Sequence, residues 1–95
     1  MAAVALSKEE AIARARADLA KRLGVSEGEI KEDGVEDADF PDLALGAPVE
    51  DEMSGQMIAT GWRIRLSAEG HSYEYRADKN QVRLYNYKGS NYKVQ

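Results

Sequence analysis

Apolar residues in the first quarter of the chain recur every three or four positions, which is the spacing of an amphipathic helix. Ser7 followed by Glu10 matches the capping box that begins a helix, and Gly24 suits the left-handed residue that ends one. The pattern therefore predicts a helix over residues 7–24, preceded by a flexible N-terminus at residues 1–6. The apolar stripe of this helix consists of Ile12, Ala15, Leu19 and Leu23.

The last third of the chain changes to an alternation of period two, which indicates half-buried strands. Arg63 and Arg65 lie on one face of the first strand, and the opposite, apolar face holds Ile58, Thr60, Trp62, Ile64 and Leu66. Two further alternating runs follow, each after a short turn. Residues 56–87 are thus predicted to form an antiparallel meander, and residues 88–95 a tail that either adds a final strand or frays.

The middle of the chain follows no clean period. Residues 30–40 mix apolar and acidic positions and are interpreted as an edge strand. Residues 40–55 contain both prolines and a run of acids, which predicts a long acidic loop.

One short helix must cover the apolar face of the meander, since neither element can bury itself alone. The predicted fold is a single α+β domain over residues 1–95, with one helix packed on three to four antiparallel strands. Two sets of side chains are expected to meet in its core: Ile12, Leu19 and Leu23 from the helix, and Trp62, Ile64 and Leu66 from the sheet.

Composition narrows the class of protein. The chain has 95 residues, of which 43% are hydrophobic and 32% charged, and it contains one histidine and no cysteine. This excludes a disulfide scaffold and the usual structural zinc sites. No apolar run approaches the ~20 residues of a membrane helix, so membrane insertion is not expected.

Charge is arranged in blocks along the chain. Residues 7–25 hold five bases and three acids, residues 26–55 hold eleven acids and one base, and residues 56–95 hold seven bases and three acids. The net charge of -4 argues against nonspecific nucleic-acid binding. The favoured interpretation is that the acidic middle pairs with the two basic ends inside the fold.

A resemblance emerges from the order of these segments. A helix, a short strand and the segments 61–66, 73–78 and 82–84 resemble the PepSY-like, broadly cystatin-like layout of a helix against a meander. The segments Phe40–Pro48 and Tyr73–Tyr75 are similar to a family of small, uncharacterised bacterial domains that are often exported or lipid-anchored. PepSY domains are proposed to bind or restrain peptidases, so the resemblance implies binding rather than chemistry. It also implies a periplasmic or extracellular location, although residues 1–6 form no intact secretory signal.

Many similar sequences carry two cysteines that this chain lacks. They stand at the positions of Ala47 and Tyr85. The resemblance implies that these two positions lie side by side, so that the long loop folds back over the end of the last meander strand.

Candidate chemistry is sparse. His71 is the only imidazole, and no nucleophile or acid motif accompanies it. The acids match no EF-hand spacing, and no phosphate-binding glycine loop is present. We therefore expect no enzyme, no metal and no cofactor.

The outward face of the meander offers one other possibility. It is predicted to mix arginines and aromatic rings in the manner of a platform for single-stranded nucleic acid. The favoured interpretation is that the arginines pair with Glu74 on a neighbouring strand and that their aliphatic stems shield the sheet from water. Nucleic acid is therefore not the expected partner. The residues are Arg63, Arg65, Arg76, Arg83, Tyr85 and Tyr87.

The sequence favours a noncatalytic protein-binding module, specifically a peptidase-directed inhibitor or regulator, acting as a monomer or weak dimer through the long loop or an exposed sheet edge. The alternative is an acidic decoy or immunity-type protein that covers a basic partner such as a nuclease. High salt should weaken decoy binding more than apolar loop insertion. The candidate contact residues are Phe40, Pro41, Asp42, Leu43, Leu45, Pro48, Glu50, Asp51 and Glu52.

Overall fold

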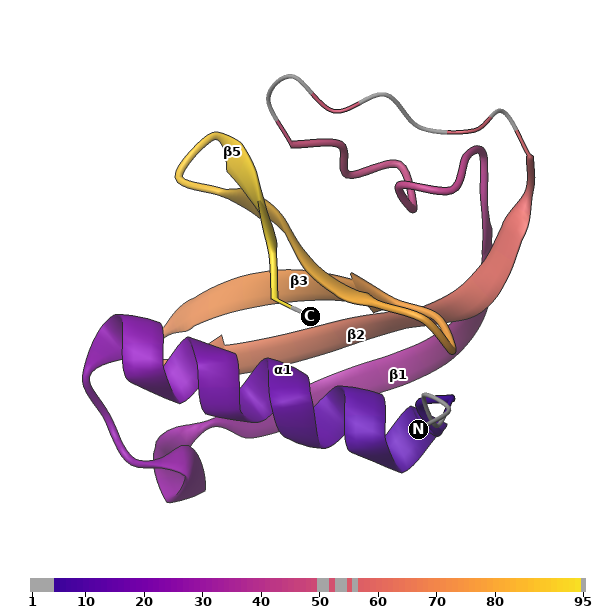
Figure 1. The fold of residues 1–95 in the computed structure, drawn as a ribbon. Coiled ribbons are helices and arrows are strands. Elements are labelled where there is room, and N and C mark those ends of the chain that lie inside the picture. Colours follow the sequence, from indigo (N-terminus) through magenta and orange to yellow (C-terminus); the bar gives the residue numbers. More distant parts are fainter. Residues whose placement is uncertain (1–4, 50–51, 53–54, 56, 95) are drawn as a thin grey trace, which may run out of the picture.

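The computed structural model describes residues 5–49, 52, 55 and 57–94. In this part of the chain, one helix packs on an antiparallel sheet whose strands follow chain order (Figure 1). The elements are α1 (Lys8–Leu23), a 3-10 turn (Glu27–Glu29), β1 (Lys31–Phe40), β2 (Ala59–Ala68), β3 (His71–Ala77), β4 (Val82–Tyr87) and β5 (Ser90–Lys93). The predicted α+β class is confirmed.

Local signals fix both ends of α1. The Ser7 hydroxyl accepts the Glu10 backbone N–H at 3.1 Å, and the Glu10 carboxylate accepts the Ser7 N–H at 3.3 Å. Gly24 closes the helix with φ +70°. The flexible segment predicted for residues 1–6 is too long, because Leu6 is buried and its N–H donates to the carbonyl of Lys79 at 2.8 Å.

The sheet has five strands, so the expectation of three to four is corrected. The additional strand comes from the predicted tail, where β5 pairs with β4. Lys88 and Gly89 provide the tight reversal with φ of 53° and 86°. Val94 then donates its N–H to the Val82 carbonyl at 2.9 Å, which ties the chain back to the start of β4.

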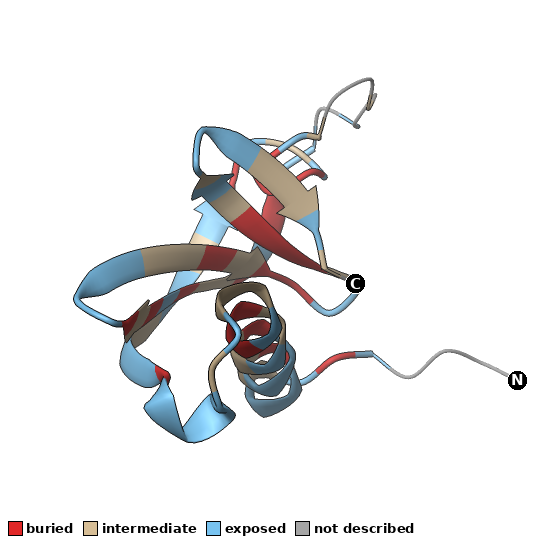
Figure 2. Ribbon diagram, turned by 90° about the vertical axis from the view of Figure 1, so that its left-hand side faces the viewer, coloured by how far each residue is buried: buried red, intermediate tan, exposed pale blue. Residues whose placement is uncertain are grey.

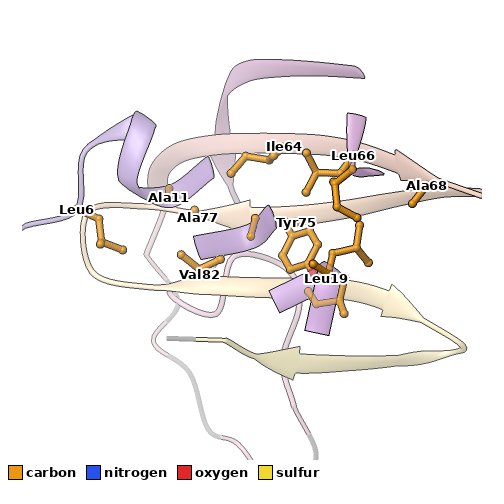
Figure 3. Close-up of a cluster of buried hydrophobic side chains, with 13 residues drawn as sticks. Leu6, Ala11, Leu19, Ile64, Leu66, Ala68, Tyr75, Ala77 and Val82 are labelled. Atoms are coloured by element: carbon orange, nitrogen blue, oxygen red, sulfur yellow. The ribbon is translucent and has the colours of Figure 1, made fainter. Parts of the chain in front are cut away.

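The main core lies between α1 and the sheet (Figure 3). Leu19, Ile64 and Leu66 are fully buried there, which confirms the expected helix-to-sheet packing, whereas Ile12, Leu23 and Trp62 are half-buried at its margin. Burial in Figure 2 is concentrated where the helix faces the strands. Tyr75 lies in the same cluster, and its hydroxyl donates to Asp18 Oδ2 at 2.7 Å. The hydroxyl of this buried tyrosine therefore has a hydrogen-bond acceptor on the helix that covers it.

Two predicted positions on the sheet are wrong. Ile58 precedes β2 and is 73% exposed instead of facing the core. Tyr87 lies on the helix side, against Tyr73 and Tyr92, rather than on the outward face. The cause is a register shift after Leu84, where Asn86 adopts φ 51°. Such a bulge reverses the side-chain alternation that follows it.

Candidate functional site

The long loop begins with a compact turn built on Asp42. One carboxylate oxygen of Asp42 accepts the backbone N–H groups of Ala44 at 2.9 Å and Gly46 at 3.1 Å. Leu45 and Gly46 both have positive φ, at 59° and 66°. A Cβ added to Gly46 would lie 2.7 Å from Nη1 of Arg76. The positive φ favours glycine here, and any larger residue would also displace the Arg76 guanidinium.

A second, smaller apolar cluster supports this turn. Phe40, Leu45 and Ala59 are buried together, with Ala38 packed at their margin. They join the loop to the end of β1 and the beginning of β2. Phe40 is 2% exposed and Leu45 is fully buried, so these two candidate contact residues position the loop and do not reach its surface.

Arg76 of β3 ties the turn to the face of the sheet opposite α1, which we call the outer face. Its Nη1 donates to the carbonyls of Leu45 at 3.0 Å and Gly46 at 3.2 Å. The same guanidinium lies 3.7 Å from the centre of the Tyr85 ring and donates through Nε to Glu74 at 2.7 Å. The loop is thus folded back over the outer face, beside the strand that carries Tyr85.

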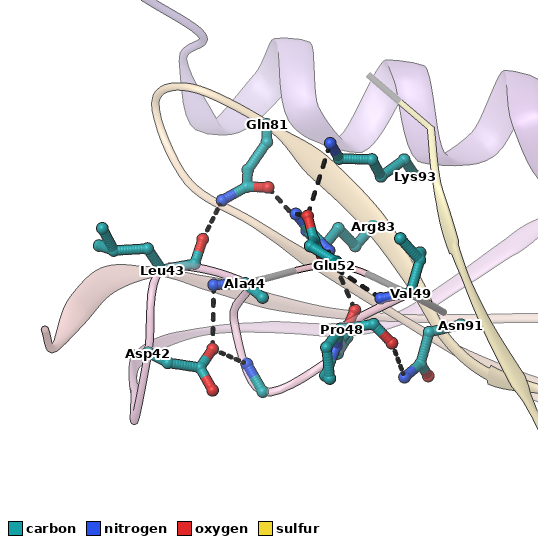
Figure 4. Close-up of polar contacts among 12 residues, drawn as sticks. Asp42, Leu43, Ala44, Pro48, Val49, Glu52, Gln81, Arg83, Asn91 and Lys93 are labelled. Carbon is teal, nitrogen blue, oxygen red and sulfur yellow. Dashed lines mark hydrogen bonds and ion pairs between the residues drawn. The ribbon is translucent and has the colours of Figure 1, made fainter. Parts of the chain in front are cut away.

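Arg83 of β4 forms the second attachment and is only 3% exposed (Figure 4). Its Nη1 and Nη2 donate to the two carboxylate oxygens of Glu52 at 2.5 and 2.6 Å. Nη1 also donates to the Ala47 carbonyl at 3.2 Å, and Nε to the side chain of Gln81 at 2.7 Å. One arginine therefore satisfies groups from two parts of the loop in a bidentate geometry.

Two amide side chains complete the attachment. Gln81 donates to the Leu43 carbonyl at 2.6 Å, and Asn91 of β5 donates to the Pro48 carbonyl at 2.8 Å. Glu52 also accepts the Val49 N–H at 3.1 Å. We call residues 41–49 together with Glu52 the braced loop, because side chains of β3, β4, β5 and the β3–β4 turn hold its backbone.

The pKa of Glu52 is lowered from 4.5 to about 2, chiefly by the hydrogen bonds from Arg83, with smaller contributions from the Val49 N–H and the Lys93 charge. Because the folded pKa is depressed, this carboxylate stabilises the fold above about pH 4.5, and the contribution disappears as the pH falls through about 2.

We expect the stability difference between the wild-type protein and Glu52→Gln to shrink by roughly 2 to 3 kcal/mol between pH 7 and pH 2. Urea denaturation at a series of pH values measures this difference. A matched Glu69→Gln variant, altered at an exposed turn, should show no such trend. A constant difference for Glu52→Gln would mean that the ion pair does not stabilise the fold.

The acidic middle of the chain pairs with both basic ends, as predicted from the charge blocks. Glu32 contacts Arg16 of α1 at 3.8 Å. Glu36 contacts two arginines of β2 at 3.1 and 3.2 Å. Glu52 also pairs with Arg83. Carboxylates of the acidic middle block therefore form ion pairs with arginines of α1, β2 and β4.

The other candidate contact residues differ in accessibility. Leu43 is 42% exposed, and its N–H donates to the Gly55 carbonyl at 3.0 Å. Pro41 and Pro48 are exposed, whereas Asp42 and Glu52 are half-buried and occupied by internal bonds. Glu50 and Asp51 lie outside the described residues.

Sequence reasoning missed two groups of residues. Met57 and Ile58 are 67% and 73% exposed and follow the loop directly. The alternation of Ile58 with β2 pointed to the core, and Met57 was assigned to no face, so neither residue was marked as accessible. Arg76 and Arg83 were expected on the outward face of the meander, with pairing to Glu74 as the favoured interpretation. Arg76 does pair with Glu74, but the bonds of both arginines to the loop were indicated only by the acidic charge of the middle block.

His71 is exposed at the start of β3 and lines a hollow of about 330 Å³ with Ser72, Tyr73, Asn86, Tyr87 and Lys88. No carboxylate is among these lining residues. Across the described part of the chain, no group of three or more histidine, aspartate or glutamate side chains is arranged to hold a metal ion. No helix among the described residues is long and apolar enough to cross a membrane.

The pair of positions implied by the resemblance leads to a second prediction. Ala47 of the braced loop is fully buried. Tyr85 stacks on the Arg76 guanidinium, which also donates a hydrogen bond to the Gly46 carbonyl next to Ala47. The double variant Ala47→Cys with Tyr85→Cys should therefore oxidise and stabilise the fold by ~2 to 4 kcal/mol. Thiol titration and denaturation with and without reductant measure this. A protein whose thiols stay free under oxidant would contradict the proposed proximity.

The fold and the loop define a small α+β domain in which a braced loop is bonded to the outer face of the sheet through Arg76 and Arg83. A family model for a domain of unknown function (DUF8738) matches residues 12–85, which include α1 from Ile12 onward, the braced loop and Arg76 and Arg83. The chain belongs to this family. Comparison with the curated proteins and with the solved structures finds no match in either.

Proposed function

We propose that this protein is a noncatalytic protein-binding module whose braced loop contacts a protein partner. The observation that carries the proposal is the attachment of the loop by the buried Arg83, which bonds to both Glu52 and the Ala47 carbonyl. A loop already held in one shape loses less conformational entropy on binding than a free one. The attachment by Arg83 therefore favours a role for this loop in binding, beyond connecting β1 to β2.

The accessible side chains of this region suit a protein partner. Among the described residues, the exposed large hydrophobic side chains are Leu43, Met57 and Ile58. Leu43 lies in the braced loop, and the other two lie between the loop and β2. Exposed apolar side chains within a polar surround are typical of protein contact surfaces. The resemblance to PepSY domains supports a peptidase as the partner, which would make the protein an inhibitor or regulator. Rigid, pre-shaped surfaces are common in protease–inhibitor complexes.

The absence of enzymatic activity is part of the proposal. His71 lies in a hollow whose lining carries no carboxylate, so no acid partner is at hand to orient it. A panel of hydrolase substrates should therefore give no turnover. Turnover that disappears in His71→Ala would overturn this part of the proposal.

The alternative function, an acidic decoy for a basic partner, receives less support. Glu32, Glu36 and Glu52 are already paired with arginines of the same chain. These internal pairs reduce the negative charge available to a partner. Binding that persists at high ionic strength supports the loop, whereas binding that collapses supports the decoy.

Photo-crosslinking from defined positions tests the proposed surface. A photoreactive amino acid is placed at Leu43 or, as the matched control, at Lys79 in the exposed β3–β4 turn. In extracts of the organism that makes the protein, we expect one discrete adduct from the Leu43 position, absent from the Lys79 position and competed by unlabelled protein. The adduct should survive high salt. Identical adducts from both positions, or loss of the Leu43 adduct at high salt, would contradict the proposal.

A further inference from the structure

A second accessible surface lies along the free edge of β1, at the margin of the sheet (Figure 1). β1 has ten residues and, among the described residues, pairs only with β2. None of the backbone hydrogen bonds that the described residues make outside helices and strands involves residues 31–40. The backbone groups of β1 that point away from β2 therefore have no backbone partner among the described residues. This edge is separate from the braced loop, so the inference goes beyond the proposed loop contact.

The free edge is longer and more regular than edges usually are. Its one irregularity lies between Glu32 and Gly34, and the register from Gly34 to Phe40 is unbroken. β1 contains no proline. Proteins commonly shorten or interrupt an exposed edge to prevent unwanted strand pairing. The opposite edge conforms to this rule, because β5 has four residues and its Asn91 side chain is bonded to the loop.

Charge along the edge discriminates between possible occupants. Asp37 and Asp39 share the helix-side face with Val35, whose strand partner Ile64 is buried in the core. Both aspartates are exposed, and no ion pair to either is found among the described residues. A second copy of β1 would bring further carboxylates to the same edge, and like charges on adjacent strands repel. A strand with basic side chains would be attracted.

We propose that the free edge of β1 binds an extended basic segment of a partner protein by strand addition. In such a pairing, side chains on one face lie about 4.5 to 5.5 Å from those on the neighbouring strand. Lysine or arginine residues two positions apart in the partner lie beside Asp37 and Asp39. The residue between them faces the other side of the sheet, next to the half-buried Ala38, and is small or apolar. Main-chain hydrogen bonds to β1 supply affinity, and the spacing of the basic residues supplies specificity.

Synthetic peptides test this inference directly. The probe is a nine-residue peptide in which threonine and valine alternate except for lysines at its fourth and sixth positions. The control peptide has the same composition, with the two lysines adjacent so that they point to opposite faces. We expect the probe to bind at least tenfold more tightly than the control, by fluorescence anisotropy at low salt.

Matched protein variants locate the contact. Asp37→Lys with Asp39→Lys should weaken binding of the probe at least tenfold. Glu27→Lys with Glu29→Lys makes the same change of charge in the exposed 3-10 turn and should alter binding less than twofold. If the first variant does not fold, Asp37→Asn with Asp39→Asn removes both charges with a smaller perturbation and should still weaken binding severalfold.

Hydrogen exchange identifies the mode of binding. In the wild-type protein, the outward amides between Gly34 and Phe40 should become protected when the probe is added. Equal binding of the two peptides, equal losses in both charge variants, or unchanged exchange in β1 would each overturn the inference. So would a dimer with protected β1 amides in the absence of peptide. Leu43→Ser should bind the probe normally, so failure at the edge and failure at the braced loop remain distinguishable.

Discussion

Arg83→Ala is expected to lower the free energy of unfolding by about 3 to 5 kcal/mol. The substitution removes a guanidinium that is 3% exposed and leaves the Glu52 carboxylate and the Ala47 carbonyl without their main donor. A carboxylate confined near the sheet without its partner costs much more than a surface ion pair contributes. Chemical denaturation at pH 7 measures the loss.

Two controls separate the effect of the buried pair from a general effect of removing an arginine. Arg63→Ala breaks more exposed ion pairs on the same face and should cost at most about 1 kcal/mol. The double variant Arg83→Met with Glu52→Leu removes both charges and should be less destabilising than Arg83→Ala alone, since no charge is left unpaired. Similar losses for Arg83→Ala and Arg63→Ala would show that the brace contributes little.

Leu19→Ala should destabilise the protein by ~2 to 5 kcal/mol. Leu19 is fully buried where α1 crosses the sheet, in the cluster that contains Ile64 and Leu66. Truncation removes apolar contact area. It also leaves a cavity, because backbone hydrogen bonds between the strands keep the surrounding sheet from collapsing fully into the space.

Ile58→Ala is the matched control for this second substitution. Ile58 is 73% exposed, so its truncation should change stability by less than about 0.5 kcal/mol. Denaturant titration of both variants, with equal slopes, compares them on the same scale. A small change for Leu19→Ala would contradict the two-layer packing.

Features encoded by neighbouring residues were predictable from the sequence. The bounds of α1 depend on Ser7, Glu10 and Gly24, which act within one turn of the helix ends. Alternation also located β2 and β3, because one face of each strand packs in the core while charged side chains occupy the other. β1 was harder to assign. As an edge strand it exposes most of its side chains, so its sequence carries little alternation.

Features that depend on distant residues were not predictable. The alternation of β4 places Arg83 on the solvent-facing side, and the bonds that hold it beneath the loop come from Ala47 and Glu52, 36 and 31 positions earlier. Tyr87 was misplaced because the bulge at Asn86 follows from pairing with β5, whose Asn91 side chain accepts the Asn86 N–H. The candidate site was located as a loop, but the division between its buried supports and its accessible side chains needed the structure.

The residues that hold the braced loop all come after it in the sequence, which has a consequence for protein synthesis. Glu52 is made before Arg83, and at ~5 to 20 residues per second the intervening 31 residues take about 2 to 6 s to translate. Asn91, which holds the Pro48 carbonyl, comes later still. During that interval Arg76 and Gln81 become available to the loop carbonyls that they bond, but Glu52 still lacks its arginine donor. The bonds from Arg83 and Asn91 can therefore form only after the residues of the loop and Arg76 have been made, and a chain truncated before β4 would lack both of these attachments.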